Sequence, residues 1–275
     1  QTIRIMRLFL SELTNYQQMF KAKLFLFFVW VTQFVYGQEI PLKGYELVWS
    51  DEFEQGELDE SKWRHRSLGE RRDAINIKEA IEIHPGGYLI IRTEKVADQI
   101  FTGMISTQNK FMPTYGYFET RVYLPREKGL WAAFWLQSPT FGKVIDDMEA
   151  SGAEIDIFEY LGNNKRRIQH ALHWNGYDEN LESRSQKVRE RQLRKGWHTF
   201  GLLWTADEYV YYVNGEENWR ISEAVSQRSQ YIILSVEVGE WAGKIKRADL
   251  PENFVVDYVR VYQEKENQNI ENQEK

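Results

Sequence analysis

Apolar and polar positions alternate with the two-residue period of a β-strand in many short segments of this chain. Turn residues such as Asn214 and Gly215 separate the segments. Strands are predicted over residues 45–49, 88–93, 116–124, 168–174, 197–204, 209–213 and 254–262, and the apolar runs 131–136 and 231–238 add two more. With roughly a dozen strands and little helical periodicity, the sequence predicts an all-β sandwich. The highly charged residues 178–194 predict a mobile loop.

One segment, residues 153–160, places three acids among apolar residues. Alternation along a strand puts Glu154 and Asp156 on one face and turns the isoleucines beside them into a core. Plain alternation would place Glu159 on the apolar face. A β-bulge near Ile157 and Phe158, which inserts one extra residue, returns Glu159 to the acidic face. The segment therefore predicts a bulged strand with three carboxylates on one side.

Three neighbouring carboxylates repel one another, which raises the pKa of one acid while another stays ionised. This is the condition for acid and base catalysis by paired carboxylates at neutral pH. In glycoside hydrolysis, one carboxyl protonates the leaving oxygen and another attacks the sugar carbon. The same pattern is also compatible with a solvated polar face or a calcium site.

The motif formed by Glu154, Asp156 and Glu159 resembles the signature of glycoside hydrolase family 16 in its bulged Glu-x-Asp-x-x-Glu form. This family includes laminarinases, lichenases and agarases. The resemblance extends from about Leu47 to Tyr262. Further matching segments follow in the family's order, at residues 115–121, 130–136, 197–200 and 257–262.

The resemblance implies a concanavalin-like jelly roll of two curved antiparallel sheets, with the substrate cleft on the concave sheet. It implies a secreted, retaining endo-glycosidase in which Glu154 is the nucleophile, Glu159 the general acid and base, and Asp156 the residue that tunes both. No cofactor takes part in such a reaction. The implied polysaccharide substrate is a β-1,3- or β-1,3-1,4-glucan. The alternatives are a galactan such as agar or porphyran, transglycosylation by the same intermediate, or a non-catalytic, lectin-like module on the same fold.

Sugar rings stack on indoles, and the chain has ten tryptophans. Ordinary core packing is the alternative for each of them. By resemblance, Trp131, Trp135 and His173 are predicted to bind substrate. Trp174 is predicted to add a stacking surface, and Trp241, after Gly239, to line the cleft. The chain departs from the family pattern at Ala132, where many members have proline. It also departs at Ser235 and Glu237, where many laminarinases carry asparagine, and this leaves the substrate open.

A structural calcium ion is also implied by the resemblance. Asp257 would supply the side-chain ligand, together with the carbonyl of Gly87 and the start of the domain. Hard oxygen ligands of this kind suit calcium. The alternative for Asp257 is an ordinary edge-strand carboxylate.

The composition narrows the class of protein further. A chain of 275 residues with 42% hydrophobic residues suits one large domain, which we place at residues 38–265, before a disordered polar tail at 266–275. The absence of cysteine excludes disulfides and thiolate sites. A formal charge of −6 gives no indication of nucleic-acid binding. We expect a monomer.

The first 37 residues predict an export signal. From Met19, a short basic segment precedes the apolar residues 24–31, and the small residue Gly37 marks a cleavage site. The apolar run is too short to span a membrane comfortably, so no membrane span is expected in the mature protein. We therefore expect a secreted, periplasmic or cell-surface protein. Residues 1–18 precede a plausible start methionine, and we expect them to be absent from the mature protein.

Overall fold

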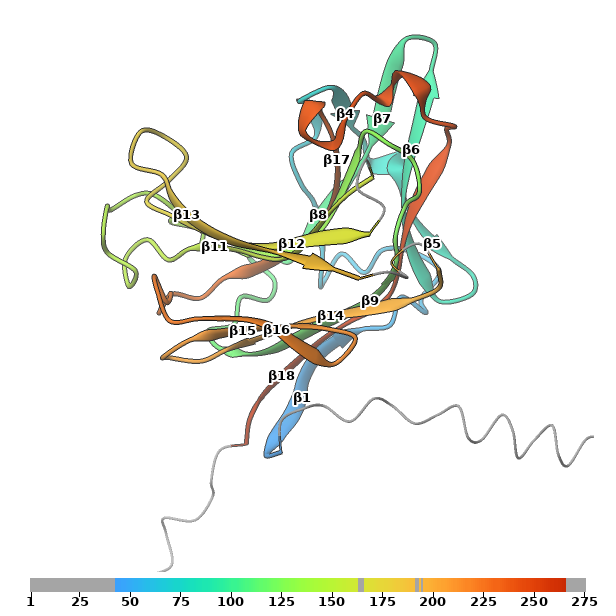
Figure 1. The fold of residues 1–275 in the computed structure, drawn as a ribbon. Coiled ribbons are helices and arrows are strands. Elements are labelled where there is room, and N and C mark those ends of the chain that lie inside the picture. The colour runs from blue at the N-terminus through green and yellow to red at the C-terminus, as the bar shows by residue number, and fades with distance from the viewer. Residues whose placement is uncertain (1–42, 163–165, 191–192, 194, 266–275) are drawn as a thin grey trace, which may run out of the picture. The chain divides into compact units, whose positions relative to one another are not determined.

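A computed structural model describes residues 43–162, 166–190, 193 and 195–265 of the chain. Two β-sheets pack face to face in this part of the protein (Figure 1). The described residues contain no α-helix, only three short 3-10 helices: η1 (Lys78–Ala80), η2 (Glu240–Ala242) and η3 (Ile245–Arg247). The predicted all-β sandwich is confirmed. The predicted signal peptide and polar tail lie outside the described residues.

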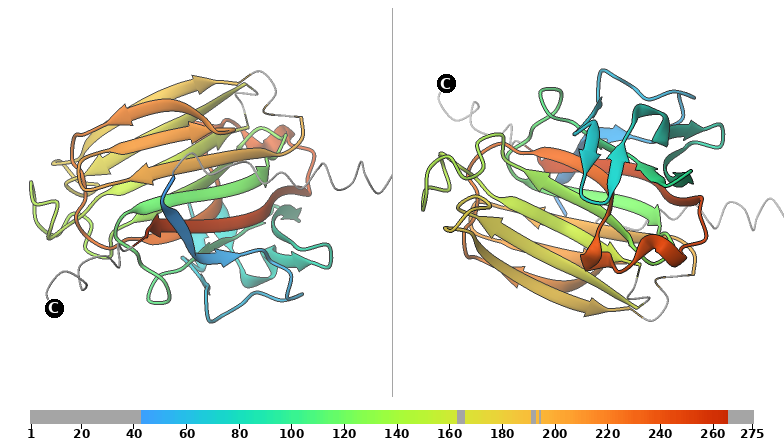
Figure 2. Two further views of the ribbon diagram at one scale, coloured as in Figure 1. Left: turned by 90° about the horizontal axis from the view of Figure 1, so that it is seen from below. Right: turned by 90° about the horizontal axis from the view of Figure 1, so that it is seen from above.

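The larger sheet contains eleven of the described strands, and it runs in the order β16-β15-β14-β9-β18-β6-β7-β4-β3, with β1 on β18 and β5 on β6. Its members are β1 (Tyr45–Asp51), β3 (Gly69–Arg71), β4 (Ala74–Asn76), β5 (Ile81–His84), β6 (Tyr88–Val96), β7 (Gln99–Thr102), β9 (Gly116–Tyr123), β14 (His198–Trp204), β15 (Tyr209–Val213), β16 (Glu216–Ile221) and β18 (Glu252–Glu264). Figure 2 shows this sheet from below on its left.

The smaller sheet contains seven of the described strands in the order β13-β12-β11-β10-β17-β8-β2. Its members are β2 (Arg64–His65), β8 (Met104–Ser106), β10 (Leu130–Gln137), β11 (Glu154–Leu161), β12 (Arg167–Trp174), β13 (Glu182–Arg189) and β17 (Tyr231–Val238). Figure 2 shows it from above on its right. Each of these strands pairs antiparallel with its neighbours.

The main hydrophobic core lies between the sheets, where Phe158 of β11 contacts the rings of Phe200 on β14 and Phe254 on β18. The outer face of the smaller sheet carries a second apolar cluster, made of Met104, Ala133, Trp135, Tyr231 and Ile233. Alternation along β10 and β17 assigns their residues to one cluster or the other. The second cluster forms an apolar floor under the acids that project from β11.

Residues 178–194 were predicted to form a loop, and this prediction is wrong for the strand β13 within them. This strand pairs with all eight residues of β12, from Arg167 opposite Arg189 to Trp174 opposite Glu182. It lies at the edge of the sheet, and its side chains are mostly exposed. An exposed edge strand needs no apolar face, and charge protects it from pairing with other chains. Hydrophobic periodicity therefore could not reveal it.

Among the described residues, no helix has the length and apolar character needed to cross a membrane.

Candidate active site

A β-bulge in β11 brings the three acids together. On β10, Phe134 pairs with Phe158 and the next residue, Trp135, pairs with Asp156, so Ile157 is the extra residue. The pairing with β12 shifts at the same place, between Asp156 and Glu159. The predicted bulge is confirmed, and it returns Glu159 to the face of the other two acids.

His170 on β12 holds the bulge in place. Its Nδ1 lies 2.5 Å from the carbonyl oxygen of Ile157, which can only accept a hydrogen bond, so Nδ1 carries the proton. Burial lowers the pKa of His170 to about 4, which keeps the ring neutral. The ring also packs 4.9 Å from the ring of Tyr211. His170 thus has a structural role, and it supports the backbone that positions Glu159.

Glu154, Asp156 and Glu159 line one cavity of about 430 Å³ on the outer face of the smaller sheet. Their exposed fractions are only 8%, 4% and 5%. The other residues that line the cavity are Arg66, Arg71, Arg72, Trp131, Ala133, Trp135, Gln137, Tyr177, Ser235 and Glu237. Two predicted substrate-binding residues, Trp131 and Trp135, are therefore in the cleft with the acids.

Burial dominates the electrostatics of the three acids. It raises the pKa of Asp156, and the hydrogen bond from His173 only partly offsets this. Burial and the nearby charge of Asp156 also raise the pKa of Glu154. The pKa of Glu159 rises well above its ordinary value because of burial and of repulsion from Asp156 and Glu154. The site therefore favours the protonated form of Glu159.

The two glutamates differ in their supporting groups. Tyr177, His173 and Gln137 all lower the pKa of Glu154 and favour its ionised form. At Glu159 only Trp131 acts in that direction. Among the described residues, no lysine or arginine forms an ion pair with any of the three acids. Three side chains thus oppose the rise in the pKa of Glu154, which still reaches about 8, and only one opposes the rise at Glu159.

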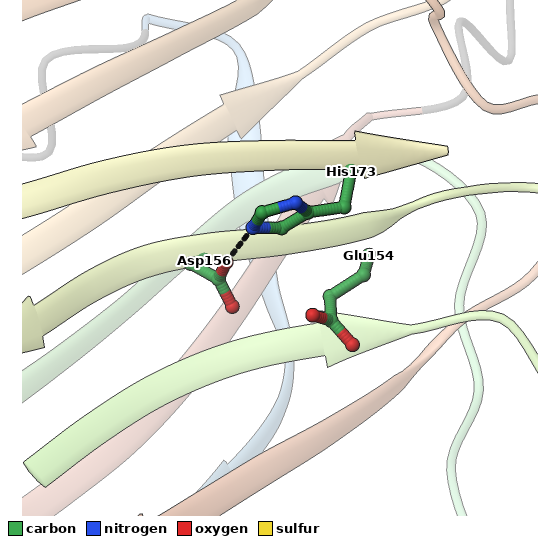
Figure 3. Close-up of side chains that lie close together, drawn as sticks. All are labelled: Glu154, Asp156 and His173. Carbon is green, nitrogen blue, oxygen red and sulfur yellow. Dashed lines mark ion pairs between the residues drawn. The ribbon is translucent and has the colours of Figure 1, made fainter. Parts of the chain in front are cut away.

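His173 lies beside Asp156, as the resemblance implied. Its Nε2 is 3.3 Å from Oδ2 of Asp156 (Figure 3). Burial alone would lower the pKa of His173, but the hydrogen bond and attraction to Asp156 outweigh it and raise the pKa. Glu154, Asp156 and His173 lie close enough to hold a metal ion. However, the raised pKa of His173 favours its protonated form, and a protonated imidazole is a poor metal ligand.

Two residues that the sequence did not single out contact Glu154. The Tyr177 hydroxyl donates to Oε2 of Glu154, and the Gln137 amide donates to the same oxygen at 2.8 Å. Burial and the charge of Glu154 raise the pKa of Tyr177, so its hydroxyl stays protonated. Alternation two residues beyond Trp135 could have placed Gln137 in the cleft. Tyr177 follows the end of β12, where the sequence gives no such signal.

An ionic cluster lies at the other end of β10. Arg71 donates its Nε to Oε1 of Glu237 at 2.7 Å, and the Arg72 Nε donates to the other carboxylate oxygen. The Arg72 guanidinium also lies 4.8 Å from the ring centre of Trp131. Arg71 and Arg72 come from the segment around β3, whose residues show no periodicity. Sequence reasoning therefore missed them, although it named Glu237 as a departure from the family pattern.

The remaining predicted aromatic residues differ in position. Trp241 in η2 packs edge-on against Trp131, with ring centres 4.5 Å apart, and so it flanks the cleft. Trp135 donates its indole N–H to Oγ of Ser235 at 3.1 Å. The prediction for Trp174 is wrong, since this side chain is buried in the core between the sheets. Trp174 follows His173 on a strand, so the two must face opposite sides.

The predicted calcium ligands lie away from the cleft. Val256, next to Asp257, pairs with Leu89 of β6, which brings Asp257 near the turn that contains Gly87. However, Oδ2 of Asp257 forms an ion pair with Arg121 at 2.6 Å. The predicted side-chain ligand is therefore already partnered by a positive charge. The donor set fits calcium only in part, and the calcium ion stays a prediction.

Comparison with known proteins gives the family. Residues 72–260 match the family described as Glycosyl hydrolases family 16. The chain belongs to this family. The family 16 assignment agrees with the resemblance in the sequence, and the chain is a glycoside hydrolase.

Two relatives illustrate the range of similar sequences. A β-glucanase of Rhodothermus marinus is 30% identical over 79% of this chain and 85% of its own length. A keratan-sulfate endo-1,4-β-galactosidase of Sphingobacterium multivorum is 28% identical over 84% of this chain and 58% of its own length. The relatives that match this chain are therefore named for action on different polysaccharides.

Solved structures show the same architecture. The laminarinase catalytic domain of Thermotoga maritima has a TM-score of 0.72 and 26% identity, and the match covers 82% of this chain and all of that domain. The laminarinase of Rhodothermus marinus has a TM-score of 0.70 and 27% identity over 81% of this chain and 98% of its own. The fold is thus the jelly-roll sandwich of family 16.

Proposed function

We propose that this protein is a secreted, retaining endo-glycosidase that hydrolyses a β-1,3- or β-1,3-1,4-glucan. The observation that carries the proposal is the group of three buried carboxylates on a bulged strand, open to a cleft and without a paired lysine or arginine among the described residues. Burying acids in this way is unfavourable for stability, and it is typical of sites where the acids react.

In the proposed reaction, Glu159 donates its proton to the glycosidic oxygen as the bond to the anomeric carbon breaks. The ionised carboxylate of Glu154 attacks that carbon and forms a glycosyl-enzyme ester. Glu159, now a carboxylate, then takes a proton from water, and the water oxygen displaces Glu154. Both glutamates return to their starting forms, and the product keeps the configuration of the substrate. Asp156, supported by His173, influences the charge of both glutamates from between them.

The substrate is proposed from the cleft floor and the relatives. Trp131 and Trp135 present aromatic surface beside the acids, which suits the C–H faces of pyranose rings. The relatives named as glucanases and laminarinases support a β-glucan. A galactan is the second candidate, favoured by the similar galactosidase and by the three arginines that line this cleft.

The test is a substrate panel of laminarin, mixed-linkage β-glucan, agarose and keratan sulfate, with the products separated by size. We expect short oligosaccharides from the β-glucans and none from the same protein carrying Glu154→Gln. If products form from agarose or keratan sulfate and not from the β-glucans, the substrate is a galactan. Longer oligosaccharides formed with an added acceptor would indicate transglycosylation. Binding without any product would identify a lectin-like protein and contradict the proposal.

We also propose export through the leader at residues 1–37 and a structural calcium ion at Asp257 and Gly87. Export is tested by expressing the chain from Met19 and sequencing the N-terminus of the protein in the medium, where cleavage after Gly37 is expected. Calcium is tested by thermal unfolding in EDTA and after calcium is restored. A calcium ion that binds Asp257 must displace Arg121 from it, and binding should raise Tm. The same Tm with EDTA and with calcium would contradict the calcium site.

A further inference from the structure

The side chain of Gln137 has four hydrogen bonds to the cleft residues around it. Its Oε1 accepts from Nη2 of Arg66 at 2.7 Å and from the Tyr231 hydroxyl at 2.6 Å. Its Nε2 donates to Oε2 of Glu154 at 2.8 Å and to the Tyr177 hydroxyl at 2.7 Å. A neutral amide offers two acceptor positions and two donors. All four are in use, so the amide has no free capacity for a sugar hydroxyl.

The orientation of this amide follows from its partners. The Arg66 guanidinium can only donate hydrogen bonds, so the atom of Gln137 that faces it must be the carbonyl oxygen. Burial raises the pKa of Tyr231, so its hydroxyl also remains a donor there. The amide nitrogen must therefore point toward Glu154. Arg66 is itself held over the rings of Tyr231 and Trp135, at 5.1 and 5.8 Å.

We propose that Gln137 is a positioning residue that holds Glu154 as an ionised carboxylate aimed at the anomeric carbon, and that Arg66 and Tyr231 fix the direction of its amide. The inference rests on the proposed function of Glu154 as the nucleophile. Gln137 suits this role because it is only 6% exposed and lies directly opposite Glu154 in the pairing of β10 with β11. Tyr177, the other donor, lies outside the strands and is 60% exposed.

The charged and titratable groups around Glu154 come from several elements. Asp156 and Glu159 on its own strand add negative charge, while His173 on β12 and Tyr177 after it favour the ionised form. Arg66, after β2, and Tyr231, on β17, act on Glu154 through Gln137. Because burial and Asp156 already favour protonation of Glu154, loss of one good donor shifts its charge further in that direction.

The first test replaces Gln137 with methionine, which has a similar shape and no hydrogen-bond donor. We expect kcat to fall by about tenfold or more, because the ionised fraction of Glu154 falls about tenfold for each pH unit by which its pKa rises. The acid limb of the kcat/KM profile should move to higher pH, while KM stays within about twofold because the amide does not contact substrate. Gln230→Met is the matched control, since Gln230 is fully buried and does not line the cleft.

Three further variants test the hydrogen-bond donor itself. With Gln137→Glu, the new carboxyl donates to Glu154 only while it is protonated. We expect activity close to wild type in acid and a loss as the pH rises, which a purely structural role would not produce. Arg66→Met frees the amide to rotate and should move the acid limb in the same direction by a smaller amount. Arg66→Lys keeps a donor and should restore part of the activity.

The outcomes separate this inference from the proposed function. A wild-type protein with no hydrolase activity would contradict the proposed function. An active wild type, with Gln137→Met as stable as Gln230→Met and with an unchanged acid limb, would overturn the role of Gln137. If Gln137→Met does not fold, Arg66→Met decides by the same pH profile. A titration of the Glu154 carboxyl by carbon NMR, assigned with Glu154→Gln, should show a higher pKa in the variants than in wild type.

Discussion

Four buried acids line the same cleft, and one of them differs from the other three in its partners. Glu237 is 7% exposed, as buried as the three acids of β11, but Arg71 and Arg72 both pair with it. Glu154, Asp156 and Glu159 have no arginine or lysine partner among the described residues, and His173 forms an ion pair with Asp156. We infer that Glu237, held by two arginines, serves the structure. The three acids without such partners have raised pKa values, which suits the proposed reaction.

The largest expected effect comes from neutralising the unpaired acids. Glu154→Gln should lower kcat by a factor on the order of 10⁴ or more, because no intermediate can form. Glu159→Gln should lower it by about 10²–10⁴-fold, the usual contribution of general acid and base catalysis. Both are measured on the preferred glucan. On an aryl glycoside whose leaving group needs no proton, the rate of bond cleavage by Glu159→Gln should return much of the way to that of wild type. The rate of Glu154→Gln should stay low. Equal loss on both substrates would contradict the separate roles.

The bulge that unites the three acids should be nearly as sensitive. His170→Phe keeps a ring against Tyr211 but removes the donor to the Ile157 carbonyl. A displacement of Glu159 by about 1 Å can lower the rate by about 10²-fold. We therefore expect a large fall in kcat on the glucan. The fall on the aryl glycoside should be smaller, because its leaving group needs no proton. Wild-type kcat in a folded His170→Phe protein would show that the bulge does not depend on this hydrogen bond.

Removing the paired acid should affect stability more than chemistry. Glu237→Gln leaves two guanidinium groups with a weaker acceptor. We expect the free energy of unfolding to fall by about 1–2 kcal/mol, toward the lower end for bonds to charged groups because both arginines are partly exposed. Urea unfolding at pH 7 measures this loss. A loss of kcat as large as that of Glu159→Gln would place Glu237 in the reaction and remove the contrast.

Neutralising Glu159, which has no arginine partner, should instead raise the stability of the protein. This is the smallest effect that we predict. The pKa of Glu159 is higher in the folded protein than in the unfolded chain, so its contribution to stability is full below about pH 4.5 and is lost as the pH rises through the folded value. Glu159→Gln should therefore have a free energy of unfolding about 1 kcal/mol or more above that of wild type at pH 8, and gain little at pH 4. Urea unfolding at the two pH values measures both differences. A variant less stable than wild type at pH 8 would contradict this sign.

The sequence predicted much of this fold because most strands bury one face. Alternation identified β11, and the mismatch at Glu159 revealed the bulge without any structure. The same rule gives the error at Trp174, which cannot share a face with its neighbour His173. The exposed strand β13 has no apolar face, so its residues carried no periodic signal.

The site was less predictable where it depends on contacts between distant segments. Arg66, Arg71 and Arg72 reach the cleft from residues around β2 and β3, and only the folded chain brings them to Gln137 and Glu237. Tyr177 likewise reaches Glu154 from beyond the end of β12. These residues decide which acid is paired with arginine and which donors face Glu154, and a local pattern of hydrophobic residues contains no information about either.

The central claim is that Glu154 attacks the sugar carbon while Glu159 supplies the proton, and the configuration of the first product tests it most directly. Proton NMR spectra taken during the first minutes of glucan hydrolysis, before the anomers equilibrate, distinguish the two configurations at the new reducing end. Double displacement predicts that the β-anomer appears first and the α-anomer only later by mutarotation. An α-anomer formed first would mean that water attacks directly, and Glu154 would not be the nucleophile.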